Sequence, residues 1–176
     1  SGAGLNSGFT DKIFEDVGAN IASDTKATLK DADIIFKIQR LMTSKDKIDE
    51  ISMCKKNAMV ISHMSALSSK TDIEEYAKAS ITTFAMDLMP RISRAQSMDV
   101  LSSQSNLSGY QAVIKGANNF NSAFPMMMTA AGTVAPAKVF IMGVGVAGLQ
   151  AIATAKRMGA IVTAYDVRAA TKEQVE

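Results

Sequence analysis

With 176 residues and 47% hydrophobic content, the chain is long enough to bury a core and is expected to be globular, as one domain or two small ones. Its 19 basic and 17 acidic residues are interleaved and give a formal charge of +2, which argues against nucleic acid as a partner. No apolar stretch approaches the ~18 residues that span a bilayer, and the start lacks a signal-peptide pattern, so this chain is not expected to insert into a membrane.

The first two thirds of the chain alternates strand-like and helix-like stretches, which is typical of an α/β layer with parallel strands. The expected helices are Asp11–Val17, Ser44–Ile51, Thr71–Lys78 and Asn106–Ser122. The expected strands are Ala32–Ile38, Ala58–Ser62 and Ile81–Met86. Ser44 suits the cap of its charged surface helix, and Thr71 with Glu74 has the spacing of a capping box.

A polar segment, Pro90–Gln104, lies between the last of these strands and the long helix. In α/β proteins, ligand-binding loops lie at such places, beyond the carboxyl ends of the strands. The guanidinium of Arg91, the amide of Gln96 and the carboxylate of Asp99 could together orient a carboxamide, a ribose and a phosphate. Ser102 extends a three-residue spacing from Gln96 and Asp99, so these side chains would face one direction in a helix. The same residues would also suit a solvated loop or a helix cap.

The segment Met126–Pro136 carries little charge and has a proline at each side, as expected for a crossing between two units. We therefore expect an N-terminal α/β unit over residues 1–127 and the beginning of a second unit over residues 128–176. Both units are expected to be incomplete. Residues Ser1–Gly4 suit a loop leaving a strand, Thr171–Glu176 resembles the first turns of a helix, and a nucleotide-binding half normally needs more strands than are present.

The run Lys138–Gly148 has the pattern of a strand followed by a glycine turn that opens a helix. Gly143 would permit the tight turn, Gly145 would let the backbone approach a pyrophosphate, and Gly148 would allow the helix to pack closely on the strand. The free N–H groups and the dipole at the helix N-terminus would favour an anion there. The spacing thus predicts a dinucleotide site, although a unit of this kind that binds nothing is the plain alternative.

A second strand, Ala160–Asp166, follows this helix and ends in an acid. Asp166 would accept hydrogen bonds from the adenosine ribose hydroxyls, and its charge would repel the 2′-phosphate of NADP. The expected ligand is therefore NAD(H). Arg168 leaves NADP(H) open, because an arginine just past the strand can receive a 2′-phosphate.

Four stretches, Met89–Asp99, Leu101–Tyr110, Phe124–Gly132 and Gly143–Gly148, together with the run up to Glu176, resemble the NAD(H)-binding component of proton-translocating transhydrogenase. The resemblance covers nearly the whole chain, more loosely before Ile81. It implies two Rossmann-like parallel-sheet units with an NAD cleft between them, the second unit being incomplete here. One departure is Leu41, where the family has proline, and the family's mobile loop would lie beyond Glu176.

The resemblance also implies a reaction and an assembly. Hydride would pass directly between NAD(H) and an NADP(H) held on a partner domain, coupled to proton translocation by a membrane domain, so position matters more than acid–base groups. A homodimer in the cytoplasm or mitochondrial matrix is implied, peripheral at the inner membrane through partner subunits. Arg91, Gln96 and Asp99 would position the nicotinamide. The remaining nucleotide contacts that the resemblance implies are Ser102, Val146, Asp166, Val167 and Arg168.

Two other functions remain open. Alanine dehydrogenases resemble the chain more weakly and need a histidine and a lysine, for which His63 and Lys37 are the candidates. A non-catalytic NAD-binding module is the third possibility. The single Cys54 cannot form an internal disulfide, which fits a reducing compartment, and it is expected to be inert.

Overall fold

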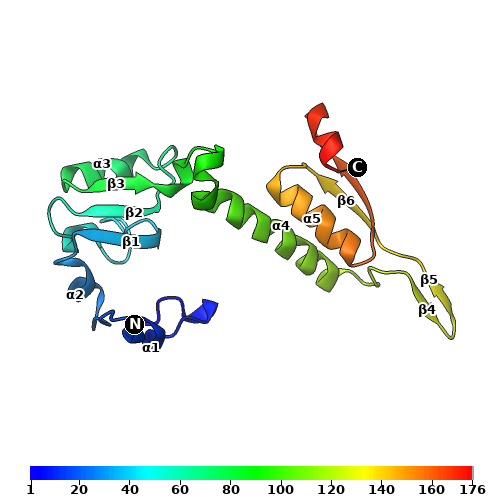
Figure 1. The fold of residues 1–176 in the computed structure, drawn as a ribbon, viewed down its shortest axis with the longest axis horizontal. Coiled ribbons are helices and arrows are strands. Elements are labelled where there is room, and N and C mark those ends of the chain that lie inside the picture. Colours follow the sequence, from blue (N-terminus) through cyan, green and yellow to red (C-terminus); the bar gives the residue numbers. More distant parts are fainter. Residues whose placement is uncertain (176) are drawn as a thin grey trace. The chain divides into compact units, whose positions relative to one another are not determined.

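The computed structural model describes residues 1–175 and divides into two compact units, Ser1–Met98 and Asp99–Glu176. The first unit contains a parallel sheet with the strand order β1-β2-β3 (Figure 1). The strands are β1 (Ile34–Gln39), β2 (Met59–His63) and β3 (Thr82–Ala85), which confirms the three strands expected from the sequence. The α-helices of this unit are α1 (Asp11–Asp16), α2 (Thr25–Leu29) and α3 (Lys70–Lys78). Its short 3-10 helices are η1 (Leu5–Ser7), η2 (Ile51–Met53), η3 (Met86–Leu88) and η4 (Ser93–Met98).

The core of this unit lies on the face of the sheet that carries Ile35 and Val60. Tyr76 of α3 is 1% exposed and packs there with the fully buried Leu41. The Tyr76 hydroxyl donates to the Leu41 carbonyl oxygen at 3.1 Å, so the phenol is satisfied inside the core. Leu41, the residue that departs from the family pattern, is therefore a core side chain with its carbonyl in use.

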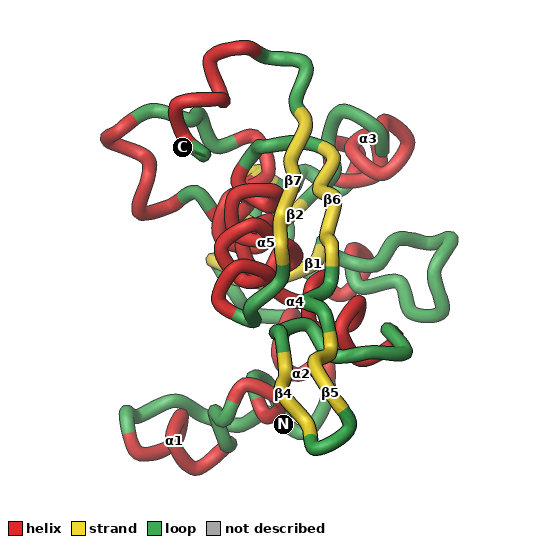
Figure 2. The backbone as a smooth tube through the Cα atoms, turned by 90° about the vertical axis from the view of Figure 1, so that its right-hand side faces the viewer, coloured by secondary structure: helices red, strands yellow, loops and turns green. Residues whose placement is uncertain are grey.

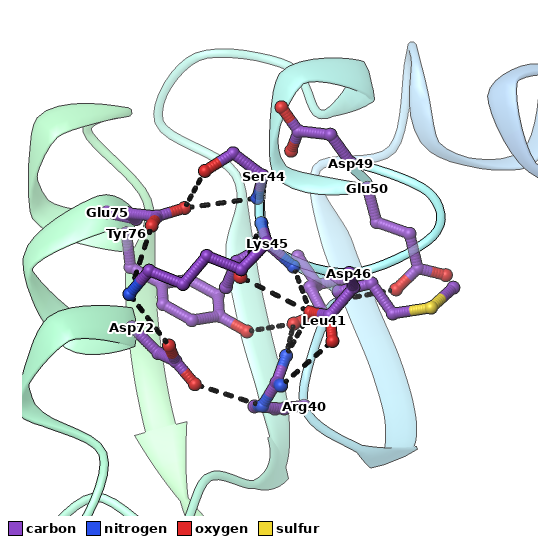
Figure 3. A network of polar contacts seen from close by, with 12 residues as sticks. Arg40, Leu41, Ser44, Lys45, Asp46, Asp49, Glu50, Asp72, Glu75 and Tyr76 are labelled. Atoms are coloured by element: carbon purple, nitrogen blue, oxygen red, sulfur yellow. Dashed lines mark hydrogen bonds and ion pairs between the residues drawn. The ribbon is translucent and has the colours of Figure 1, made fainter.

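The helix expected over Ser44–Ile51 is wrong, and side-chain bonds to the backbone explain why (Figure 3). The Asp46 carboxylate accepts from the backbone N–H of Thr43 at 2.7 Å and from Arg40 at 2.8 Å. The Glu50 carboxylate accepts from the N–H of Met42 at 2.7 Å. Carboxylates that bind nearby backbone N–H groups stabilise turns at the expense of a helix.

The starts of two helices in this unit were not predicted correctly. Ser69 occupies the N-cap of α3 without a side-chain hydrogen bond, so Thr71 lies inside the helix and the capping box is wrong. Helix α2 was not anticipated. Its N-cap is Asp24, whose carboxylate accepts from the Ala27 N–H at 2.7 Å, the bond that an aspartate cap normally makes.

The second unit is a βαβ unit with one further helix. Strands β6 (Lys138–Met142) and β7 (Ile161–Tyr165) pair in parallel through α5 (Val146–Arg157), which lies along one face of the pair (Figure 2). The long helix α4 (Val100–Asn119) packs against α5. An antiparallel hairpin of β4 (Met127–Thr129) and β5 (Gly132–Val134) precedes β6, and the 3-10 helix η5 (Ala169–Gln174) follows β7. Glu176, the last residue of the expected terminal helix, lies outside the described residues.

The boundary between the two compact units follows Met98, which is earlier in the chain than the boundary that the sequence suggested at residue 127. The reason is α4, whose close packing on α5 joins it to the βαβ unit. The two helices come very close at Gly109 of α4, because a Cβ atom there would lie 2.0 Å from the carbonyl oxygen of Ala147. The low-charge segment after the helix forms the β4–β5 hairpin.

Candidate functional site

The glycine turn joins β6 to α5. Gly143 has φ 95°, a conformation that side-chain-bearing residues rarely adopt, and its N–H donates to the Tyr165 carbonyl oxygen at 2.7 Å. This bond extends the pairing of the two parallel strands by one step. The turn is thus fixed to the end of β7, beside the acid that follows that strand.

Gly145 and Gly148 serve the turn in different ways. Gly145 is the N-cap of α5 and is exposed, and a Cβ atom there would meet nothing within 4 Å, so its backbone is open to an incoming group. A Cβ atom at Gly148 would lie 1.8 Å from the Gly143 carbonyl oxygen. Gly148 therefore lets the first turn of α5 lie directly against the glycine turn. Val146, the first residue of α5, is 38% exposed at this end of the helix.

Asp166 connects the glycine turn to the segment after β7. Its side chain is 7% exposed, and Oδ2 accepts from the Val144 N–H at 2.7 Å. The backbone N–H of Arg168 donates to Oδ1 at 2.8 Å, which makes an Asx turn. The Arg168 side chain adds Nε to Oδ1 and Nη2 to Oδ2, both at 3.0 Å. These donors, the Arg168 guanidinium foremost, hold the pKa of Asp166 well below its ordinary range.

A cavity of about 390 Å³ opens beside this carboxylate. Its volume falls in the usual range of small-molecule sites. Asp166 and Arg168 meet there with residues of the glycine turn and of η5. The other lining residues are Val144, Ala164, Tyr165, Ala169, Thr171, Lys172 and Val175. Val167, expected as a contact, is 85% exposed between Asp166 and Arg168.

Asp99 and Ser102 form a second cluster, at the start of α4. Asp99 is the N-cap, and its Oδ1 accepts from the Ser102 N–H at 2.9 Å while its Oδ2 accepts from the Ser102 hydroxyl at 2.6 Å. The helix-cap interpretation of these two residues is therefore realised, and it explains why α4 begins before the expected Asn106.

Arg91 and Gln96 belong to the first unit and to neither of these clusters. Gln96 lies on η4, Arg91 precedes it, and both residues are exposed. The fold thus gathers the predicted residues Gly143, Gly145, Val146, Gly148, Asp166, Val167 and Arg168 at one edge of the second unit. It pairs Asp99 with Ser102 at another place in that unit.

The residues considered for alanine dehydrogenase chemistry lie in the first unit. The Lys37 ammonium pairs with the carboxylate of Glu50, which is 7% exposed, and it also donates to the Arg40 carbonyl oxygen at 3.4 Å. His63 ends β2 opposite Gln39 and is half-buried. Because the buried carboxylate of Glu50 already neutralises the charge of Lys37, this lysine is poorly suited to bind a substrate carboxylate.

Cys54 lies close to the same acid. Its thiol donates to the Glu50 carbonyl oxygen at 3.3 Å, and burial raises the pKa of the thiol. A raised pKa reduces the thiolate fraction, so the side chain is a poor nucleophile.

Sequence reasoning missed two contributions to the site. Thr171 and Lys172 line the cavity beside Asp166, and their only signal is a polar run directly after a strand that ends in an acid. Gly109 sets the distance between α4 and α5, and its signal is a glycine in the interior of a predicted helix. Among residues 1–175, there is no group of three or more side chains suited to a metal ion, and no helix is long and apolar enough to cross a membrane.

Comparison with known proteins places these observations in a family. The model of the alanine dehydrogenase/PNT N-terminal domain matches residues 1–108, and that of the alanine dehydrogenase/PNT C-terminal domain matches residues 112–176. An NAD(P) transhydrogenase alpha subunit of Rhodospirillum rubrum is 59% identical over 175 residues, which are 99% of this chain and 46% of that protein. The chain therefore spans about half the length of such curated relatives.

Solved structures agree on the fold. The crystal structure of transhydrogenase from Sinorhizobium meliloti matches 99% of this chain and 50% of its own, with a TM-score of 0.91 and 55% identity. A structure of L-alanine dehydrogenase matches the whole chain and 47% of its own at a TM-score of 0.79, but at 20% identity it shows only a shared fold. The α/β class with parallel sheets and the resemblance to the transhydrogenase component are both confirmed.

Proposed function

We propose that this chain, which belongs to the alanine dehydrogenase/PNT family, is the NAD(H)-binding part of the alpha subunit of a proton-translocating transhydrogenase. The observation that carries the proposal is the glycine turn. Gly143 and Gly148 shape it, Gly145 leaves its backbone open at the N-terminus of α5, and Asp166 lies beside the 390 Å³ cavity next to it. The identity to the Rhodospirillum rubrum protein supports this interpretation.

In the proposed binding mode, the pyrophosphate lies against the glycine turn and the adenosine occupies the cavity beside Asp166. The exposed backbone at Gly145 and the N–H groups at the start of α5 favour a bound anion. Asp166 binds the ribose hydroxyls, and Val146, Val167 and Arg168 line the approach.

The proposed reaction transfers a hydride from NADH to NADP⁺, giving NAD⁺ and NADPH, or the reverse. Two electrons and one hydrogen nucleus move together from one nicotinamide to the other, so no protein group need take up a proton. The task of the protein is to hold the rings in position. Arg91, Gln96 and Asp99 position the nicotinamide in this proposal, and Ser102 acts with Asp99, with which it is already hydrogen-bonded.

The reaction requires partners. An NADP(H)-binding domain supplies the second nicotinamide, a membrane domain couples the transfer to proton movement, and two copies of the subunit associate. The chain would then work in the cytoplasm or the mitochondrial matrix and be held at the inner membrane through its partners. The domain boundary near residue 127 also stays a proposal.

Alanine dehydrogenase chemistry is the second candidate, because the family includes those enzymes. It is less well supported, since Lys37 is paired with Glu50 and the cavity of about 300 Å³ beside that pair is also lined by Asp24. Two carboxylates near one lysine disfavour an amino-acid or oxo-acid substrate.

The test is NADH oxidation by the protein at its full natural length, measured with pyruvate plus ammonium and, separately, with an NADP(H)-binding partner domain and an NADP analogue. Turnover only with the partner is expected. Turnover with pyruvate would make the protein an alanine dehydrogenase, and NADH binding without turnover in either assay would leave a non-catalytic binding module. In the partner assay, Gln96→Asn should slow hydride transfer more than it weakens NADH binding. Equal small effects on both would remove Gln96 from the nicotinamide site.

A further inference from the structure

The carboxylate of Asp166 has no acceptor position left for a ribose. A carboxylate offers about four lone-pair positions, two on each oxygen. Oδ1 receives the backbone N–H and the Nε of Arg168, and Oδ2 receives the Val144 N–H and the Nη2 of Arg168. A ribose that is to bind Asp166 must therefore displace a donor.

The four donors differ in how easily they can leave. The N–H groups of Val144 and Arg168 belong to the backbone, one in the glycine turn and the other in the Asx turn, and cannot move without breaking the local fold. The Arg168 side chain is 61% exposed, whereas that of Asp166 is 7% exposed. The guanidinium can therefore swing into solvent while the carboxylate stays in place.

We propose that the Arg168 guanidinium is a built-in mimic of the ribose diol, so that this side chain competes with the adenosine ribose for Asp166. Nε–H and Nη2–H are two parallel donors, one to each carboxylate oxygen, at 3.0 Å. The 2′- and 3′-hydroxyls of a ribose are likewise two adjacent donors with the spacing to meet one carboxylate. The inference rests on the proposed function. It adds that Arg168 sets the affinity of this site for the nucleotide and its selectivity between a plain and a 2′-phosphorylated ribose.

The exchange has opposite consequences for the two nucleotides. For NAD(H), the ribose replaces the two side-chain bonds of Arg168 with two of its own, so part of its binding free energy goes into breaking the ion pair. For a nucleotide with a 2′-phosphate, the released guanidinium lies beside the new anion and can bind it. Arg168 thus weakens the binding of the plain ribose and favours the binding of the phosphorylated one.

Arg168→Met tests this, because methionine has similar length and no donor. Competition against NADH fluorescence in the full-length protein would give the dissociation constants of AMP, 2′-deoxy-AMP and 2′,5′-ADP. We expect AMP to bind about threefold more tightly to the variant, because its ribose no longer has to break the ion pair between Arg168 and Asp166. The gain is small because an exposed ion pair contributes little free energy. We expect 2′,5′-ADP to bind about tenfold more weakly, since a charge-assisted bond is lost.

The 2′-deoxy nucleotide gives a second readout. In the unmodified protein, Arg168 can return to the position that the missing hydroxyl leaves, so removal of the hydroxyl should weaken binding by only about twofold. In Arg168→Met nothing fills that position, and the loss should grow to about tenfold. Lys172→Met is the matched control, because it removes one positive charge from the same cavity. It should weaken both anionic ligands and leave the effect of the hydroxyl unchanged.

Each outcome decides the matter. Opposite changes for AMP and 2′,5′-ADP in Arg168→Met, absent from Lys172→Met, support the mimic. Equal weakening of both ligands by Arg168→Met, no change in either, or the same opposite pattern in Lys172→Met would overturn it. Failure of the unmodified protein to bind NADH would instead overturn the proposed function, so the two failures are distinguishable.

Discussion

Gly109→Ala is expected to destabilise the protein, because Gly109 is where the backbones of α4 and α5 approach each other. The added Cβ atom would lie 2.0 Å from the carbonyl oxygen of Ala147 and 2.8 Å from its carbonyl carbon. Both are backbone atoms in the first turn of α5, so no side-chain rotation can relieve the overlap. The two helices would have to separate.

Two opposing effects set the size of the change. Alanine is better than glycine inside a helix by about 0.8–1 kcal/mol. Nonbonded carbon atoms prefer separations of ~3.5–4.0 Å, so the helices would have to move apart by roughly 1.5 Å at this point. Such a shift loosens Val113 of α4 against Ala151 and Ala155 of α5, all buried in one core. Overpacking typically costs about 1–3 kcal/mol, and we expect a net loss of about 1–2 kcal/mol.

Gly116→Ala is the matched control within the same helix. A Cβ atom at Gly116 meets nothing within 4 Å, so the variant should be more stable by about 0.5–1 kcal/mol through helix propensity alone. Urea-unfolding midpoints of the full-length protein and both variants measure the two effects. If Gly109→Ala proved as stable as Gly116→Ala, the close contact between α4 and α5 would be refuted.

Four further predictions concern two residues of the glycine turn, one residue of the core and the only histidine. Gly148→Ala puts a methyl group 1.8 Å from the Gly143 carbonyl oxygen and should lower the free energy of unfolding by about 1–3 kcal/mol. Gly145→Ala, in open space at φ −85°, should leave that free energy unchanged in urea unfolding but weaken NADH binding in a fluorescence titration; unchanged binding would remove Gly145 from the phosphate site. Burial raises the pKa of Tyr76 from 10.0 to about 12, so its contribution to stability is complete below pH 10 and is lost as the pH rises towards 12. Between pH 9 and 11, this loss should reach about 1 kcal/mol and be absent from Tyr76→Phe, and equal losses in the two proteins would contradict it. His63→Ala should leave the NADH dissociation constant intact, whereas a tenfold increase would assign this side chain to the nucleotide site.

The βαβ unit was the part of the fold best predicted from sequence, because its signals are local. Glycine is needed where φ is positive, as at Gly143, and where a Cβ atom has no room, as at Gly148. The apolar strands on either side supply the rest of the pattern, and β7 lies within one residue of the expected strand Ala160–Asp166 at each end.

The errors arose where side-chain carboxylates accept hydrogen bonds from nearby backbone N–H groups. The charged run after Leu41 resembles a surface helix by composition, but Asp46 and Glu50 accept from backbone N–H groups and make it a turn. The long helix was expected to begin at Asn106, yet Asp99 caps it and α4 begins at Val100. Composition does not reveal which donor a carboxylate finds.

The candidate site was predicted only in part for the same reason. The spacing from Gly148 to Asp166 indicates a ribose acceptor, but it carries no information on whether that acceptor is already occupied. The occupancy depends on the rotamer of Arg168 and on the position of the Val144 N–H, neither of which the spacing encodes. The packing of α4 against α5 is likewise a tertiary feature, to which the close contact at Gly109 belongs.

Asp166 therefore has two tasks that a single substitution cannot separate. It holds the glycine turn through the Val144 N–H, and it would bind the ribose in the proposed function. An Asp166→Asn variant that lost NADH affinity could have lost either the shape of the turn or the contact itself, because an amide retains only one of the two acceptor oxygens. Removal of the Arg168 side chain does not break the hydrogen bond from Val144 to Asp166. The substitution therefore frees acceptor positions on the carboxylate and leaves the glycine turn in place. The direction of the affinity change on removing Arg168 is for this reason a better measure of how Asp166 meets a nucleotide than the loss of Asp166 itself.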